Sequence, residues 1–154
     1  MRPSDVMLVL PSRMSSVDEV ESFVDQVIQS FQLTDDLRGN LLISLTEAVT
    51  NAIRHGNRLA EDKYVQVEVW NKKRKLRVLV RDEGCGFEPT ELPDPTSPSC
   101  IATEGGRGVF LMRALSDEIR FFEEGTVVEM CYDHEACTEP TGACIAQMAV
   151  AAQA

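Results

Sequence analysis

Apolar residues recur at helical spacing in two stretches of the first 57 residues. The first stretch covers residues 17–31 and predicts an amphipathic helix. A serine at position 15 or 16, with Glu19 in capping-box position, is expected to cap the start of that helix. Thr34, followed by two aspartates that complement the positive end of a helix dipole, predicts the start of a second helix that ends around residue 57.

A different pattern, with period two, covers the middle and the end of the sequence. Valines alternate with polar or aromatic residues over 65–70, and a second alternating run of Leu and Val covers 76–81. The polar connection 71–75 between these runs predicts an antiparallel hairpin. A further helix is predicted after residue 108, and three more strands are predicted at residues 6–10, 118–122 and 126–132.

The composition is typical of a globular protein. The chain has 154 residues, 44% of them hydrophobic and 26% charged, and we expect one domain over residues 1–132 and an Ala-rich extension over 133–154. No apolar run reaches the roughly 20 residues that a membrane span needs. The first residues lack the pattern of a signal peptide, so a cytoplasmic location is expected.

The charge and the cysteines bear on which partners and which kinds of site are expected. A formal net charge of −10 argues against direct binding to nucleic acid, because such binding needs a basic surface. It is compatible with a basic protein partner. The five cysteines are an odd number without a CxxC spacing, so a disulfide scaffold and a zinc site are both poorly supported.

Glu47 and Asn51 lie four residues apart in the second predicted helix, so their side chains share one face of it. A carboxylate beside an amide oxygen suits a general base next to a ligand for a hard cation. Mg²⁺ prefers oxygen ligands and takes only one or two of them from the protein. Exposed pairs of this kind are common, so the pair indicates a site only together with other motifs.

Two glycine-containing segments supply such motifs. Asp82 ends a predicted strand and is followed by Gly84 and Gly86, which permit close approaches that side chains would forbid. Residues 88–104 contain prolines at four positions and predict a long loop, whose length suggests a lid. That loop leads into Gly105–Gly108 at the start of a helix, where free backbone N–H groups favour phosphate.

In this order, residues 47–56, 82–87 and 105–108 resemble the N box, the DxGxGF box and the second glycine box of the GHKL ATPases. That superfamily includes gyrase, the heat-shock chaperone, histidine kinases and MutL. The nearest resemblance is to the small anti-sigma-factor serine kinases of the RsbW and SpoIIAB type, and it covers roughly residues 5–132.

The resemblance implies a Bergerat-type α/β (α+β) two-layer sandwich, in which helices cover one face of a mixed, mostly antiparallel sheet. It also implies an adenine site. Asp82 would accept a hydrogen bond from the adenine amino group, which guanine lacks. Gly84 and Gly86 would let the backbone approach the base and sugar, and Thr126 would support the contact between Asp82 and adenine.

The same resemblance implies ATP and Mg²⁺ as cofactors at the other end of the site. Asn51 would be the Mg²⁺ ligand. Gly106 and Gly108, together with Arg107, would gather phosphate charge at a helix N-terminus. Glu47 would be the general base that takes the proton from a serine hydroxyl.

The function implied by the resemblance is that of a protein serine kinase. It would phosphorylate a STAS-type anti-sigma-factor antagonist and sequester a sigma factor, and it would form a homodimer. Two alternatives stay open at this stage: an ATP-binding module that holds a partner without phosphoryl transfer, and a histidine-kinase catalytic domain. Arg54 and Asn57 border the first motif and are candidates for a phosphate contact.

Overall fold

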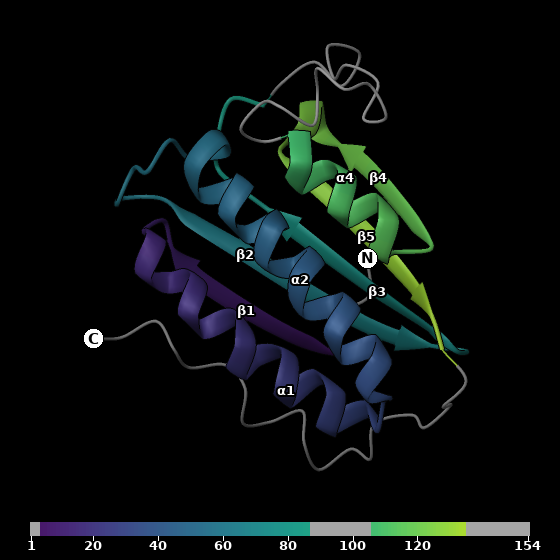
Figure 1. Ribbon diagram of the computed structural model, residues 1–154. Helices are drawn as coiled ribbons and strands as arrows, with labels where there is room; N and C mark the ends of the chain where they lie inside the picture. Colours follow the sequence, from purple (N-terminus) through teal and green to yellow (C-terminus); the bar gives the residue numbers. More distant parts are fainter. Residues whose placement is uncertain (1–3, 87–105, 135–154) are drawn as a thin grey trace.

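The computed structural model describes residues 4–86 and 106–134, which form a layer of helices on one face of a sheet (Figure 1). The helices are α1 (Glu19–Phe31), α2 (Asp35–Asn51) and α4 (Gly106–Leu115). Helix α2 lies between the other two and contacts both of them. This arrangement confirms the expected two-layer α+β sandwich.

The sheet has five strands in the order β1-β2-β3-β5-β4, and each described pair is antiparallel. The expected mostly antiparallel sheet is therefore antiparallel throughout the described residues, with no parallel pair among them. The predicted hairpin is confirmed as β2 and β3. The strand bounds are β1 (Val6–Pro11), β2 (Tyr64–Lys72), β3 (Lys75–Arg81), β4 (Glu118–Phe122) and β5 (Val127–Asp133).

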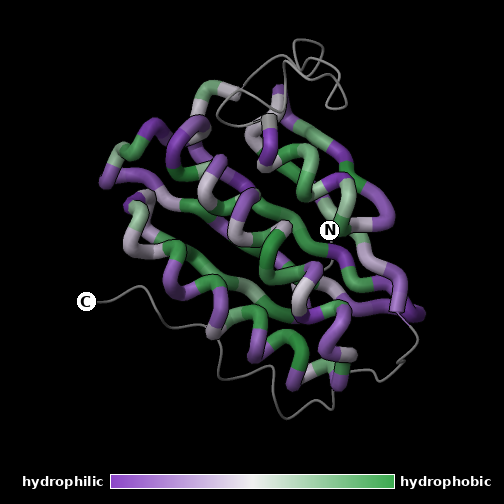
Figure 2. The backbone as a smooth tube through the Cα atoms, in the orientation of Figure 1, coloured by the Kyte–Doolittle hydropathy of each residue, from purple (hydrophilic) through white to green (hydrophobic). Residues whose placement is uncertain are grey.

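The core lies between the two layers, as the alternation of apolar residues predicts. Val65, Val67 and Val69 of β2 are fully buried, and they belong to the same cluster as Leu41 and Leu45 of α2. Figure 2 shows hydrophobic residues concentrated in the strands and on the helix sides that face them. Burial of this stripe holds α2 against the sheet and fixes which of its faces is left for other contacts.

The two predicted helix starts have different outcomes. Thr34 caps α2 as expected, because its side-chain oxygen accepts a hydrogen bond from the Leu37 backbone N–H at 3.4 Å. The predicted capping box before α1 is wrong. A short 3₁₀ helix, Met14–Asp18, precedes α1, and Asp18 occupies the cap position without a side-chain bond. Ser16 is buried in that turn, so its hydroxyl is not placed to cap α1.

A buried hydrogen bond links helix α2 to strand β5 in the core. Ser44 and Tyr132 are almost fully buried, and their side-chain oxygens lie 2.5 Å apart. Ser44 also donates to the Asn40 carbonyl at 2.6 Å, so the Tyr132 hydroxyl is the donor toward Ser44. Burial raises the pKa of Tyr132, and its hydroxyl therefore stays protonated and able to donate.

We expect Tyr132→Phe to lower the free energy of unfolding by about 1 kcal/mol, the net value of one buried hydrogen bond. Urea denaturation measures this loss. Tyr64→Phe is the control, because it makes the same change at a tyrosine that is exposed on β2. A Tyr132→Phe variant as stable as the Tyr64→Phe variant would contradict a stabilising role for the bond.

Two predictions lie outside the described residues: the lid over 88–104 and the extension beyond residue 134. The division into a domain over 1–132 and an extension over 133–154 therefore stays a prediction. Within the described part of the chain, no helix has the length and apolar content that a membrane span requires.

Candidate functional site

Helix α2 brings Glu47 and Asn51 together, and the first turn of α4 lies against both. A Cβ atom added to Gly108 would lie 2.7 Å from Glu47 Oε2 and 3.1 Å from Asn51 Nδ2. Any larger residue at position 108 would therefore displace these side chains. The structure thus juxtaposes the first predicted motif and the second glycine box, which are separated by about fifty residues in the sequence.

Beyond Asn51 the helix changes its winding. Residues Ala52–Gly56 form a π-helical turn, closed by a hydrogen bond of 2.7 Å from the Asn57 N–H to the Ala52 carbonyl. Such turns are rare in proteins and often lie at functional sites. This turn brings Gly56 against the Asp82 carboxylate, since an added Cβ would lie 2.6 Å from Asp82 Oδ1.

One continuous helical segment therefore touches both ends of the candidate site. Glu47 lies near its middle, and Gly56 lies nine residues later beside Asp82. At 1.5 Å per residue, these two positions are about 13 Å apart along the helix axis. A separation of this size suits an extended ligand with one end at Asp82 and the other at Glu47.

Asp82 is partly buried at the end of β3. Its backbone N–H donates to the Thr126 carbonyl at 3.0 Å, and its Oδ1 accepts from the Gly84 N–H at 2.8 Å. Burial raises the pKa of Asp82, and this effect outweighs the opposing effects of the Gly84 hydrogen bond and the charge of Lys63. A partly desolvated carboxylate with one oxygen already bonded is a selective acceptor for a single additional donor.

The glycines and the threonine of the predicted adenine site occupy different positions around Asp82. An added Cβ at Gly84 would lie 2.7 Å from Asp82 Oδ1 and would also clash with the Gly56 carbonyl. Gly86 has a φ of +75° and packs against the backbone of Glu124. Thr126 contacts Asp82 through its backbone carbonyl, whereas its hydroxyl donates to the Glu123 carbonyl at 2.9 Å.

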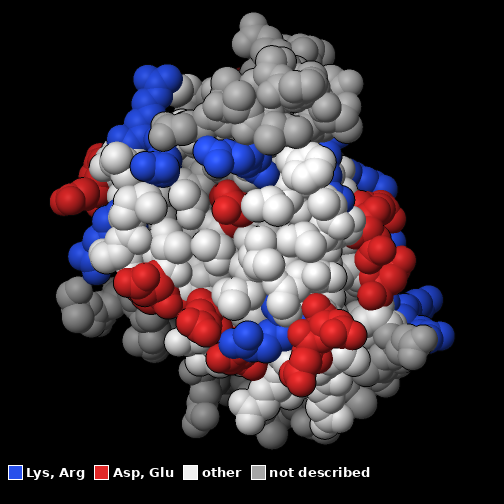
Figure 3. All heavy atoms as spheres, in the orientation of Figure 1, with Lys and Arg blue, Asp and Glu red and all other residues white. Residues whose placement is uncertain are grey.

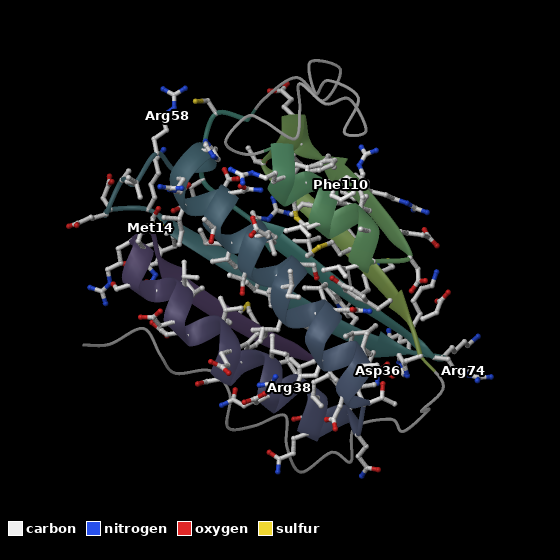
Figure 4. The ribbon with its side chains drawn as sticks, viewed as in Figure 1. Met14, Asp36, Arg38, Arg58, Arg74 and Phe110 are labelled. Carbon is white, nitrogen blue, oxygen red and sulfur yellow. The ribbon has the colours of Figure 1, made fainter. Side chains whose placement is uncertain are left out.

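The other end of the site has a positive character. Gly106, Arg107 and Gly108 form the first turn of α4, where backbone N–H groups have no partner within the helix. Arg107 is exposed. Arg54 is also exposed and lies in the π-helical turn, between Asn51 and the Gly56 that contacts Asp82. Figure 3 shows Lys and Arg side chains gathered where α2 ends and α4 begins. In Figure 4, Arg58 extends away from the molecule beyond the end of the helical segment.

The residues present fit a magnesium nucleotide. Asn51 supplies a hard oxygen ligand beside Glu47 and the α4 N-terminus, and Asp82 supplies an acceptor whose carboxylate packs closely against Gly56 and Gly84. Within the described ranges, no group of three or more His, Cys, Asp or Glu could hold a metal by itself. That finding is compatible with Mg²⁺, which takes most of its ligands from water and phosphate.

Comparison with known families agrees with this geometry. The family described as the histidine kinase-like ATPase domain matches residues 10–132, which include the whole of the described site. The chain belongs to this family. Membership in a family of ATPase domains implies the use of ATP, and it agrees with the resemblance carried by the three motifs.

Several relatives of this ATPase domain bear the name serine-protein kinase RsbW. The protein from Listeria monocytogenes is 30% identical over 108 residues, which are 66% of each chain. The protein from Bacillus subtilis is 28% identical over 121 residues, 75% of this chain and 76% of the relative. The protein from Bacillus licheniformis is 32% identical over 103 residues, 62% of this chain and 64% of the relative.

The structure contradicts the phosphate contact predicted for the Asn57 side chain. Asn57 was a candidate for a phosphate contact, but only 1% of its surface is exposed and its side chain is bonded within the protein. A sequence signal exists, because a polar residue directly after a helix-ending glycine often bonds to nearby backbone. That signal does not tell which backbone groups are bonded.

Proposed function

We propose that this ATPase domain is a protein serine kinase that acts as an anti-sigma factor. In this proposal it phosphorylates a serine of a STAS-type antagonist and sequesters a sigma factor, and the two partners exchange on it. The proposal extends to a cytoplasmic homodimer that uses ATP and Mg²⁺. The names of the relatives support the serine kinase reaction. The position of Glu47 beside the first turn of α4 supports assigning that reaction to this site.

The position of Glu47 is the observation that carries this proposal. Its carboxylate lies against the first turn of α4, beside Asn51 and at the end of the site opposite Asp82. A module that only binds nucleotide has no need of a carboxylate there, because a negative charge beside phosphates weakens their binding. A kinase needs one, since a serine hydroxyl is a poor nucleophile at neutral pH.

In the proposed reaction, Glu47 accepts the proton of the serine hydroxyl as that oxygen attacks the γ-phosphorus of ATP. The new O–P bond gives phosphoserine, while the bond from the γ-phosphorus to the bridging oxygen breaks and ADP leaves. Asn51 lies one helical turn away and would hold Mg²⁺ through its side-chain oxygen. When bound, ATP would supply the phosphoryl group, and Mg²⁺ would neutralise part of the phosphate charge. The first turn of α4, with Gly106, Arg107 and Gly108, would orient the phosphates through backbone N–H groups and the Arg107 guanidinium.

At the other end, Asp82 would fix the base. Its free oxygen would accept the amino group of adenine, whereas guanine would place a carbonyl oxygen against the same carboxylate. Gly84 and Gly86 would shape the space for base and sugar, and Thr126 would hold Asp82 through the backbone bond described above. The site would therefore prefer ATP to GTP.

The decisive experiment is phosphoryl transfer to a partner. The full chain is incubated with γ-labelled ATP, Mg²⁺ and each STAS-type antagonist of the same organism, and the labelled residue is identified. We expect label on one serine of one antagonist, and capture of a sigma factor by the chain when that antagonist is phosphorylated. Nucleotide binding without transfer to any antagonist would overturn the kinase proposal in favour of the binding module.

A further inference from the structure

Asn57 is a buried polar residue that directly follows the first motif, residues 47–56. Its Nδ2 donates to the Tyr64 carbonyl at 2.9 Å, and its Oδ1 accepts from the Glu83 backbone N–H at 2.8 Å. The Glu83 carboxylate closes the ring, because its Oε2 accepts from the Tyr64 N–H at 2.6 Å. We call these three hydrogen bonds the Asn57 clasp.

The clasp acts on the backbone that carries Asp82. The peptide group before Asp82 is fixed by the bond from its N–H to the Thr126 carbonyl at 3.0 Å. The peptide group after it is fixed by the bond from the Glu83 N–H to Asn57. With both flanking peptide groups held, the direction of the bond from Cα to Cβ of Asp82 is set by β5 on one side and by Asn57 on the other.

Asn57 also connects the two ends of the site. It directly follows the π-helical turn, and its own N–H closes that turn on the Ala52 carbonyl. The same helical segment carries Glu47 and Asn51, so the hydrogen bond from the Glu83 N–H to the Asn57 side chain ties the backbone next to Asp82 to that segment. Gly56, directly before Asn57, packs against the Asp82 carboxylate.

We propose that Asn57 is a positioning residue, which fixes Asp82 for adenine recognition and sets its distance from Glu47 and Asn51. Asn57 would touch neither nucleotide nor metal. An amide is required at this position because it must donate to one backbone group and accept from another, and neither aspartate nor leucine can do both. The inference rests on the proposed function, in which Asp82 binds adenine.

The test compares variants of the clasp in the full chain, with ATP and GTP affinities measured directly in the presence of Mg²⁺. Asn57→Ala removes two of the three bonds, and Glu83→Ala removes the third while changing only an exposed side chain. We expect ATP affinity to fall about tenfold in Asn57→Ala, the loss of roughly one well-placed hydrogen bond to a charged group. Glu83→Ala should show a smaller loss.

Two features separate positioning from a merely structural role. The preference for ATP over GTP should fall together with ATP affinity, because a displaced Asp82 discriminates less well between the bases. Glu83→Gln should restore both, since its amide oxygen still accepts from Tyr64. Tyr132→Phe serves as the control that loses stability away from Asp82 and should keep the preference of the wild type.

The outcomes are distinct. If Asn57→Ala and Glu83→Ala keep both ATP affinity and the preference for ATP, the positioning role is wrong, even if both variants unfold more easily. Should Asn57→Ala fail to fold, Glu83→Ala and Glu83→Gln still decide the matter. A wild-type chain that binds no ATP would overturn the proposed function itself, which is a different result from a wild type that binds ATP and variants that do so equally well.

Discussion

Replacing Glu47 by glutamine is expected to reduce the rate of phosphoryl transfer by about 10² to 10⁴, the usual contribution of a general base. Glutamine has almost the same shape, so the contact with Gly108 is kept, but its amide cannot accept the serine proton. ATP affinity should stay the same or rise slightly, because the change removes a negative charge beside the phosphates. Single-turnover transfer to the antagonist measures the first effect and direct titration the second.

The matched control is Glu61→Gln. It makes the same chemical change at an exposed carboxylate in the turn before β2, and it should leave both transfer and binding unchanged. A Glu47→Gln variant that transfers phosphate at nearly the wild-type rate would show that another group takes the proton. A variant that loses ATP binding instead would assign Glu47 to the nucleotide site without a catalytic role.

Much of the architecture could be predicted because local and long-range preferences agree in this chain. The alternating valines of β2 and the helical stripe of α2 each present one apolar face, and burying both faces against each other produces the observed sandwich. The order of the three motifs could be recognised for the same reason, because each follows a recognisable element.

Other details depend on tertiary contacts that a sequence pattern does not contain. The turn between β2 and β3 consists of Lys73 and Arg74, both with positive φ, although neither is glycine or asparagine. The turn follows from the lengths of β2 and β3 and from the register in which β3 pairs with β5. Likewise, the π-helical turn and the clasp of Asn57 follow from how the end of the helical segment meets β3.

The contacts of the candidate site residues could be predicted less well than the elements that carry them. Glu47 and Asn51 lie against Gly108, which brings the first motif and the second glycine box together. Thr126, in contrast, contacts Asp82 through its backbone, and Gly86 packs against Glu124. Backbone contacts of this kind leave little trace in residue identity, because many side chains are compatible with them. The roles of these residues toward nucleotide remain predictions.

Replacing Asp82 by asparagine is expected to lower ATP affinity by about ten- to a hundredfold, the loss of one hydrogen bond to a charged acceptor. If the amide oxygen keeps the bond from the Gly84 N–H, the amide nitrogen faces the amino group of adenine, and two donors meet. The preference for ATP over GTP should fall as well, since the amide can donate to the guanine carbonyl. Glu83→Gln is the neighbouring control and should bind like the wild type.

The unliganded Asp82→Asn variant is expected to be at least as stable as the wild type, although it binds ATP less well. Because burial raises the pKa of Asp82, the Asp82 carboxylate binds a proton more readily in the folded chain than in the unfolded chain. The contribution of Asp82 to the free energy of unfolding therefore falls as pH rises from the ordinary aspartate pKa to the raised one. The loss of stability from burying the charged carboxylate persists at neutral pH. Asparagine does not bear that cost.

The same shift determines the pH dependence of binding. Wild-type ATP affinity should decrease on acidification as Asp82 takes up a proton, beginning at a higher pH than an ordinary aspartate would give, whereas the already weakened affinity of Asp82→Asn should not change over that window. Titrations of both proteins at several pH values, with urea denaturation of the unliganded chains, measure the two effects. If both proteins show the same pH profile, Asp82 does not bind adenine. A marked loss of stability in the variant would show that the carboxylate of Asp82 stabilises the fold instead.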